Sequence, residues 1–328
     1  HASTEPAVMT PVEIRRHEIM LVPESSRVII RPFIPSGVQR ITTIIGRALA
    51  LSEDDVIRDL DALRREFESR HLDIDSPLVE NFEKVVPHIL TQRPLSRERK
   101  LLIGALFSGE YAPESTALFN PSIVPHPDQE GVPDGGLRFI MSLRATGEGH
   151  ISSIEFRTGL IEPDGGIHLD PFSRFVTGPE IDPDPGYKKT PFLVKLQETG
   201  FDSTCTAAVM DSLGEDFTRS DLVRSMLRIR RGIRPIPEGL DNALHRIQWL
   251  ADSNYQMSFP SKLAMSERII FPVSPNESNG IEDARFVRFT EDDGTVMYYA
   301  TYTAYNGRAI LPQLIETKDF LHFRVLTL

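Results

Sequence analysis

The sequence changes character at Tyr111, and this change constrains the fold more than any other feature. Before Tyr111, apolar residues recur every three or four positions, which is the spacing of amphipathic helices. After it, apolar and polar residues alternate over short segments separated by Pro, Asp and Gly. Short strands about ten to fifteen residues apart are typical of sandwiches, barrels and propellers. We therefore expect a mostly helical region at 1–110 and a mainly β region at 111–328.

The same patterns predict individual elements on both sides of this boundary. In the first region we expect helices at 38–50, 56–71, 77–90 and 96–108. In the second we expect strands at 118–124, 136–144, 151–158 and 160–167. Helical spacing returns at about 187–252, which we interpret as an insertion between strand units. Each β unit opens with a Pro/Asn/Gly stretch, and such echoes are typical of propeller blades.

Composition excludes several classes of protein. The 328 residues carry a formal net charge of -11, which argues against nucleic acid as the main partner, since phosphate attracts basic surfaces. A single cysteine, Cys205, excludes an intramolecular disulfide framework and fits a reducing compartment. No apolar run approaches the roughly 18 residues of a membrane span. We therefore expect a cytoplasmic protein without a membrane partner.

Familiar cofactor and metal motifs are missing. The sequence has no P-loop, and Gly147-Glu148-Gly149 lacks the strand-to-helix context of a dinucleotide site. It has no His-Glu-x-x-His motif and too few cysteines for a cysteine-rich zinc site. Ser152-Ser153 lacks the glycines of a nucleophile elbow. The sequence thus predicts neither a bound metal nor an organic cofactor.

An acidic segment at 277–289 is the first candidate for chemistry. Glu282, Asp283 and Arg285 follow a Ser/Asn/Gly turn and precede an alternating run that predicts two strands joined at 291–294. Unpaired carboxylates are strongly disfavoured in a core, so these acids indicate either a turn or a site. In the first interpretation, Arg285 holds Asp283 as a turn cap. In the second, Asp283 takes part in acid–base chemistry.

A second candidate comprises the segments 119–124 and 142–153, with a tyrosine-rich run at 298–308 following the acidic one. An asparagine, several arginines, a lone acid and clustered tyrosines suit a sugar ring. Guanidinium forks bind hydroxyl pairs, aromatic faces stack on C–H surfaces, and a carboxyl group donates a proton. The alternative for the tyrosines is packing within half-buried strands.

Four short motifs carry a family resemblance. They are Phe119-Asn120-Pro121, Leu143-Arg144, Gly280-Ile281-Glu282-Asp283-Ala284-Arg285 and Tyr302-Thr303-Ala304-Tyr305. In this order they resemble glycoside hydrolase family 130, which contains β-mannoside phosphorylases and β-mannosidases. The resemblance covers about residues 111–181 and 255–328. It implies a five-bladed β-propeller, of which this sequence would hold only the first blades, with the chain continuing beyond Leu328 to complete propeller and active site.

The resemblance also implies site residues. Asp283 takes the position of the family's general acid in an inverting mechanism, in which the proton reaches the glycosidic oxygen through a mannose hydroxyl. Asn120, Arg144 and Arg285 match positions near the mannose. A further pair, Tyr305 and Arg308, would face the same cavity. The sequence departs from the family pattern at Ala284, where Pro or Met is usual, and in its helical region and insertion.

The expected function is cleavage of β-mannosidic linkages in small oligosaccharides by phosphorolysis, giving mannose 1-phosphate with inorganic phosphate as co-substrate. Three alternatives stay open at this point. They are hydrolysis of the same linkage, a catalytically inactive carbohydrate-binding or scaffold protein on the same fold, and an unrelated sandwich used for protein contacts. The helical region is a candidate for homo-oligomer formation, because an amphipathic surface must be covered.

Overall fold

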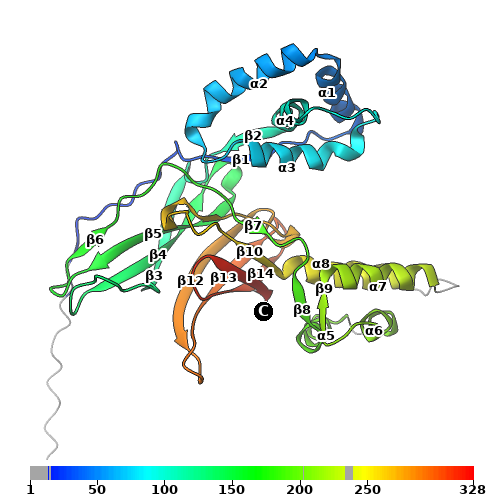
Figure 1. Ribbon diagram of the computed structural model, residues 1–328. Coiled ribbons are helices and arrows are strands. Elements are labelled where there is room, and N and C mark those ends of the chain that lie inside the picture. The colour runs from blue at the N-terminus through cyan, green and yellow to red at the C-terminus, as the bar shows by residue number, and fades with distance from the viewer. Residues whose placement is uncertain (1–13, 15, 202, 233–238) are drawn as a thin grey trace, which may run out of the picture.

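The structure is a computed structural model that describes residues 14, 16–201, 203–232 and 239–328 (Figure 1). It is mainly β, with one large mixed sheet and several helices. The helices are α1 Val38–Ala50, α2 Glu53–Phe67, α3 Asp75–Val85, α4 Arg97–Leu106, α5 Lys189–Glu198, α6 Thr204–Asp211, α7 Arg219–Gly232 and α8 Leu240–Ser253. The strands are β1 Ile29–Pro32, β2 Ser108–Tyr111, β3 Ala117–Pro125, β4 Leu137–Thr146, β5 Ser152–Ile161, β6 Ile167–Leu169, β7 Glu180–Ile181, β8 Gly186–Lys188, β9 Asp216–Thr218, β10 Tyr255–Ser258, β11 Ile269–Ile270, β12 Gly280–Thr290, β13 Val296–Tyr305, β14 Ile310–Thr317 and β15 His322–Thr327.

Helices α1–α4 gather at one end of the molecule and join the large sheet through the β1–β2 pair (Figure 1). Serine caps begin two of them: Ser52 accepts a hydrogen bond from the Asp55 backbone nitrogen, and Ser96 accepts one from that of Arg99. Helix α4 ends before the expected position because Ser108 already pairs with Pro32 in the β1–β2 ladder.

The large sheet consists of two antiparallel units. Strands β3, β4 and β5 form the first unit with β6 and β11 on β5, and β12–β15 form the second with β10 and β7. The two units are joined by a parallel pair between Gly280 of β12 and Ser152 of β5. Within the described strands, the order runs from β3 to β7 without closing on itself. The sheet is therefore open.

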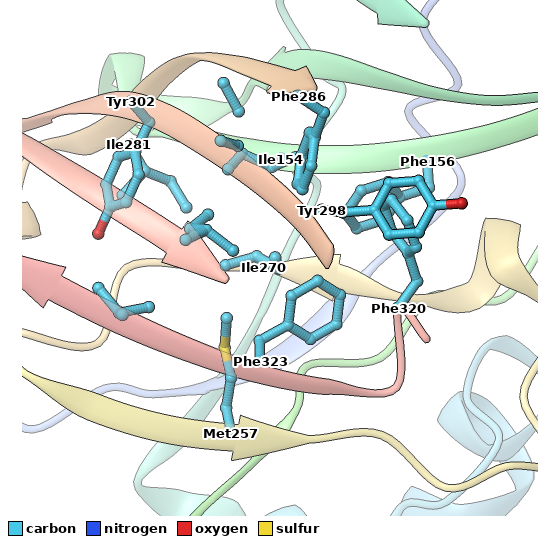
Figure 2. Close-up of a cluster of buried hydrophobic side chains, with 14 of the residues drawn as sticks. Ile154, Phe156, Met257, Ile270, Ile281, Phe286, Tyr298, Tyr302, Phe320 and Phe323 are labelled. Atoms are coloured by element: carbon cyan, nitrogen blue, oxygen red, sulfur yellow. The ribbon is translucent and has the colours of Figure 1, made fainter. Parts of the chain in front are cut away.

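The main core lies between these two units (Figure 2). Phe156 of β5 packs edge-on against Phe286 of β12, with ring centroids 6.1 Å apart, and against Phe320 at 5.9 Å. Tyr298 of β13 closes on Phe320 at 4.9 Å. Aromatic pairs of this kind contribute beyond the area they bury. This packing fixes β5 of the first unit beside β12 of the second.

The strand expected at 160–167 is wrong. Strand β5 already ends at Ile161, and β6 begins only at Ile167. Between them Glu162 donates its backbone N–H to the Gly166 carbonyl at 2.7 Å, and Gly165 adopts a φ of 85°. A glycine in this left-handed region closes a tight turn, so the segment is a hairpin.

The helices α5–α8 have a core of their own. Leu196, Val209, Leu222 and Ile247 are completely buried in it. The β8–β9 pair contributes Tyr187 and Phe217 to this core. Trp249 of α8 ties it to the sheet region, because its indole nitrogen donates to Asn276 at 2.7 Å.

Four charged side chains are buried together between the N-terminal segment and the first sheet unit. Arg27, Glu114 and Glu155 are 0% exposed and Arg157 is 2% exposed. Arg27 forms ion pairs with both glutamates, and Arg157 contacts Glu114 at 2.7 Å. Burial of an ionised group is costly unless it is paired, and here each charge has an opposite partner.

The two buried glutamates have opposite pKa shifts. Burial raises the pKa of Glu155 to about 8, aided by repulsion from Glu114 and opposed by the arginines. Burial also acts on Glu114, but the hydrogen bond from Glu155 and the charges of Arg157 and Arg27 outweigh it, so its pKa is lowered. The pair therefore shares one proton, which resides on Glu155.

This shared proton predicts a pH dependence of stability. Between the unfolded pKa of 4.5 and the folded pKa of about 8, the folded chain holds a proton that the unfolded chain has released. The free energy of unfolding should therefore fall as pH rises through this window and level off above it. Glu155→Gln removes this titration. Between pH 5 and pH 9 we expect the free energy of unfolding to decline less in the variant than in wild type, by on the order of 2–4 kcal/mol.

Urea unfolding of wild type and Glu155→Gln at both pH values measures the difference. Every other titrating group is common to the two proteins. The difference between their declines from pH 5 to pH 9 therefore reports Glu155 alone. Equal declines in the two proteins would contradict the shared proton.

Candidate functional site

Two matching β-bulges form the candidate site. The β3–β4 register shifts between Phe119 and Ser122, and the β12–β13 register shifts between Glu282 and Arg285. Each bulge places a non-glycine residue in the left-handed region, Asn120 at φ 52° and Asp283 at φ 57°. Asn and Asp tolerate this region better than other side chains, and bulges re-aim the residues that they contain.

The two bulges lie against each other. Asn120 donates its side-chain amide to Oδ1 of Asp283 at 2.5 Å, across 163 positions of the chain. A second contact runs the other way, from β12 to β3: Arg285 donates to the Pro121 carbonyl at 2.7 Å. The first strands of both sheet units are thus locked together at their bulges, and Asp283 is held at this junction.

Arg144 organises the two carboxylates. Its Nη2 donates to Oε1 of Glu282 at 2.6 Å, and its Nη1 lies 3.4 Å from Oδ1 of Asp283. Its Nε donates to Oγ of Ser152 at 2.9 Å. The guanidinium carbon lies 5.0 Å from the centre of the Phe119 ring, in a cation–π contact. The arginine is therefore fixed by two carboxylates, a hydroxyl and a ring.

The site is open on its acidic side. The Arg144 side chain is 18% exposed, whereas those of Glu282 and Asp283 are 27% and 43% exposed. Oδ2 of Asp283 makes no hydrogen bond within the ranges that the structure describes. An accessible carboxyl oxygen beside a half-buried cation can exchange a proton with a bound hydroxyl group and bind it by hydrogen bonding.

The structure brings Asn120, Arg144 and Asp283 into one cluster, but not the other expected residues. Arg285 is exposed and contacts the Pro121 backbone, so the interpretation in which it holds Asp283 is wrong. Tyr305 pairs with Gly280 at the end of β13 that lies nearest the cluster. Arg308 is exposed in the following turn, where its backbone N–H donates to Asn306.

The tyrosine-rich run alternates between core and surface. Tyr298 and Tyr302 are 1% and 4% exposed, and both belong to the main core. Glu277, the first acid of the acidic segment, is also completely buried and accepts hydrogen bonds from the hydroxyls of Tyr255 and Tyr302. Strand packing thus accounts for the two buried tyrosines and for Glu277.

The sequence placed Ser152 and Glu282 inside the candidate segments 142–153 and 277–289 but gave neither of them a role of its own. Glu282 shares a face of β12 with Arg285 through their partners Thr303 and Thr301 on β13. The bulge between them sets two residues, Asp283 and Ala284, opposite Tyr302 alone. The sequence therefore shows no regular alternation that would indicate this arrangement. No local pattern identifies Ser152 within its segment, since its role depends on a contact between β5 and β4.

The described ranges contain no group of three or more His, Cys, Asp or Glu side chains arranged to hold a metal ion. None of the helices in those ranges is long and apolar enough to cross a membrane.

Comparison with known proteins gives no match to a family model, a curated protein or a solved structure.

Proposed function

We propose that the chain is a carbohydrate-active enzyme of the kind found in glycoside hydrolase family 130. It cleaves β-mannosidic linkages with inversion, by phosphorolysis that yields mannose 1-phosphate. The observation that carries the proposal is the contact of Asn120 and Arg144 with Asp283. These three residues come from the separate motifs of the resemblance, and their meeting at one point supports a common site.

The repeated bulge supports a propeller-like arrangement. Both sheet units begin with a strand whose bulge carries Asn or Asp at positive φ, and the units pack face to face. Blades of a propeller repeat one antiparallel unit around an axis, with their first strands innermost. We propose that these two units are blades of a five-bladed propeller and that the site faces its axis.

In the proposed reaction Asp283 is the proton donor. Its proton passes to a mannose hydroxyl, whose own proton passes to the glycosidic oxygen as the bond to the anomeric carbon breaks. An oxygen of inorganic phosphate attacks that carbon from the opposite face, so the configuration inverts. The carboxylate left on Asp283 is stabilised by the Asn120 amide and the Arg144 guanidinium, which act most strongly on the charged form.

A second candidate is carbohydrate binding without cleavage. It is favoured by the exposure of the Asp283 side chain, 43%, because a proton donor works best when water is excluded. In that case Asp283 and Glu282 would bind sugar hydroxyls as hydrogen-bond acceptors.

Product analysis with β-mannobiose, with and without inorganic phosphate, tests the proposal. Mannose 1-phosphate formed only when phosphate is present is the expected result. Free mannose in equal amounts under both conditions would indicate a hydrolase instead. No product, together with a thermal midpoint that millimolar mannosides leave unchanged, would overturn both enzymatic and binding functions.

A further inference from the structure

We propose that Ser152 is a positioning residue that fixes the Arg144 guanidinium and, through it, the orientation of Glu282 and Asp283. Its effect on catalysis rests on the proposed function, whereas its hold on Arg144 does not.

Ser152 contacts Nε, the nitrogen that joins the guanidinium group of Arg144 to the rest of its side chain. Nε of Arg144 donates to Oγ of Ser152 at 2.9 Å, while the two terminal nitrogens point to the carboxylates. The Phe119 ring supports one face of the guanidinium but leaves it free to turn within its plane. The Nε bond removes that rotation, because Nε lies between the side-chain stem and the fork.

The serine hydroxyl is shielded from solvent. Ser152 is 0% exposed, and its Oγ lies 3.3 Å from the hydroxyl of Thr146, which is itself buried. Removal of the hydroxyl would leave Nε without its acceptor, next to two buried residues. An unsatisfied buried donor of this kind destabilises the geometry that creates it, so Arg144 would turn away.

Ser152 also forms the joint between the two sheet units. Its backbone pairs with Gly280, the first residue of β12, and Asp283 follows three positions later. Gly280 has a φ of 136°, and a Cβ added there would lie 2.8 Å from the Ser152 nitrogen. The close approach thus requires glycine. One residue therefore contacts Arg144 through its side chain and the strand of Asp283 through its backbone.

The chain offers a matched control in the next residue. Ser153 is also 0% exposed and also lies on β5, but its hydroxyl points to the Ala145 carbonyl at 3.4 Å and not to Arg144. Ser153→Ala removes the same atom from the same strand without changing the Arg144 contact.

The experiment compares the chain as wild type, Ser152→Ala, Ser152→Thr and Ser153→Ala. Nuclear magnetic resonance with ¹⁵N-labelled arginine follows the Nε–H signal of Arg144, assigned by its absence in Arg144→Lys. We expect slow hydrogen exchange in wild type, Ser152→Thr and Ser153→Ala, and exchange at least about tenfold faster in Ser152→Ala. On β-mannobiose, Ser152→Ala should lose about tenfold in kcat with KM changed less than about twofold.

The outcomes separate the two proposals. Unchanged Nε–H exchange in Ser152→Ala would overturn the hold of Ser152 on Arg144, whatever the enzyme does. Faster exchange with unchanged kcat would overturn the positioning role. Absence of turnover in wild type counts against the proposed function, and the arginine signal then still decides whether Ser152 holds Arg144.

Discussion

Asp283→Asn is expected to lower kcat/KM on β-mannosides by about 10³-fold, because the variant cannot donate a proton. Asparagine keeps the shape of the side chain and an oxygen to accept from Asn120 and Arg144. The bulge should persist, since asparagine also tolerates a φ of 57°. The loss would therefore report chemistry rather than folding. Initial rates with and without inorganic phosphate measure it.

Asp292→Asn is the matched control for this variant. Asp292 is exposed in the turn after β12, so the substitution makes the same change of charge and size away from the cluster. Its kcat/KM should stay within about twofold of wild type. Wild-type turnover by Asp283→Asn would rule out Asp283 as the proton donor.

The sequence is a good guide to the elements of this fold and a poor guide to how they meet. The helical and β textures predict α1, the hairpin of β12 and β13, and the helical stretch before β10. They fail where a glycine turn divides one apparent strand, as at Gly165. The spacing of apolar residues indicates which secondary structure a segment favours. A turn inside an alternating run leaves that alternation almost unchanged, so the spacing does not reveal it.

The candidate site shows the same limit at higher resolution. Before the bulge in β12 the buried apolar side chain is Ile281, whereas Ala284 within the bulge and Phe286 after it are buried. The bulge thus changes which positions face the core. For this reason Arg285 contacts the Pro121 carbonyl and not Asp283, the partner considered from the sequence. Asn120, Arg144 and Asp283 come from three of the four motifs, and they lie in contact. The contacts that fix Arg144 depend on the joint between sheet units, which the sequence does not encode locally.

The N-terminal segment bears on the rigidity of the first sheet unit, and so on the site. Leu21 packs against the outer face of that unit, on Phe139, Met141 and Leu143. Arg27 ends this segment in the buried charged cluster. Strand β5 carries both Glu155 of that cluster and Ser152 of the site. Loss of Arg27 should therefore loosen the strand on which Arg144 is anchored.

Arg27→Met is expected to lower the free energy of unfolding by about 3–5 kcal/mol, the range found when one partner of a buried ion pair is removed. The arginine donates to Glu114, to Glu155 and to the Ser266 carbonyl, and methionine fills its volume without donating to any of them. Three buried acceptors are then left short of a donor, and buried groups without partners cost more than their hydrogen bonds contribute.

Urea unfolding at pH 7 measures the effect, and Arg58→Met is the control. Arg58 also forms an ion pair, with Asp55, but its side chain is 66% exposed, and pairs at the surface contribute little. We expect a much smaller loss of unfolding free energy for Arg58→Met than for Arg27→Met. If both arginine variants lost the same small amount, the buried cluster would not stabilise the fold. A large loss confined to Arg27→Met would identify the cluster as the anchor of the N-terminal segment on β5, and thereby as the support beneath the candidate site.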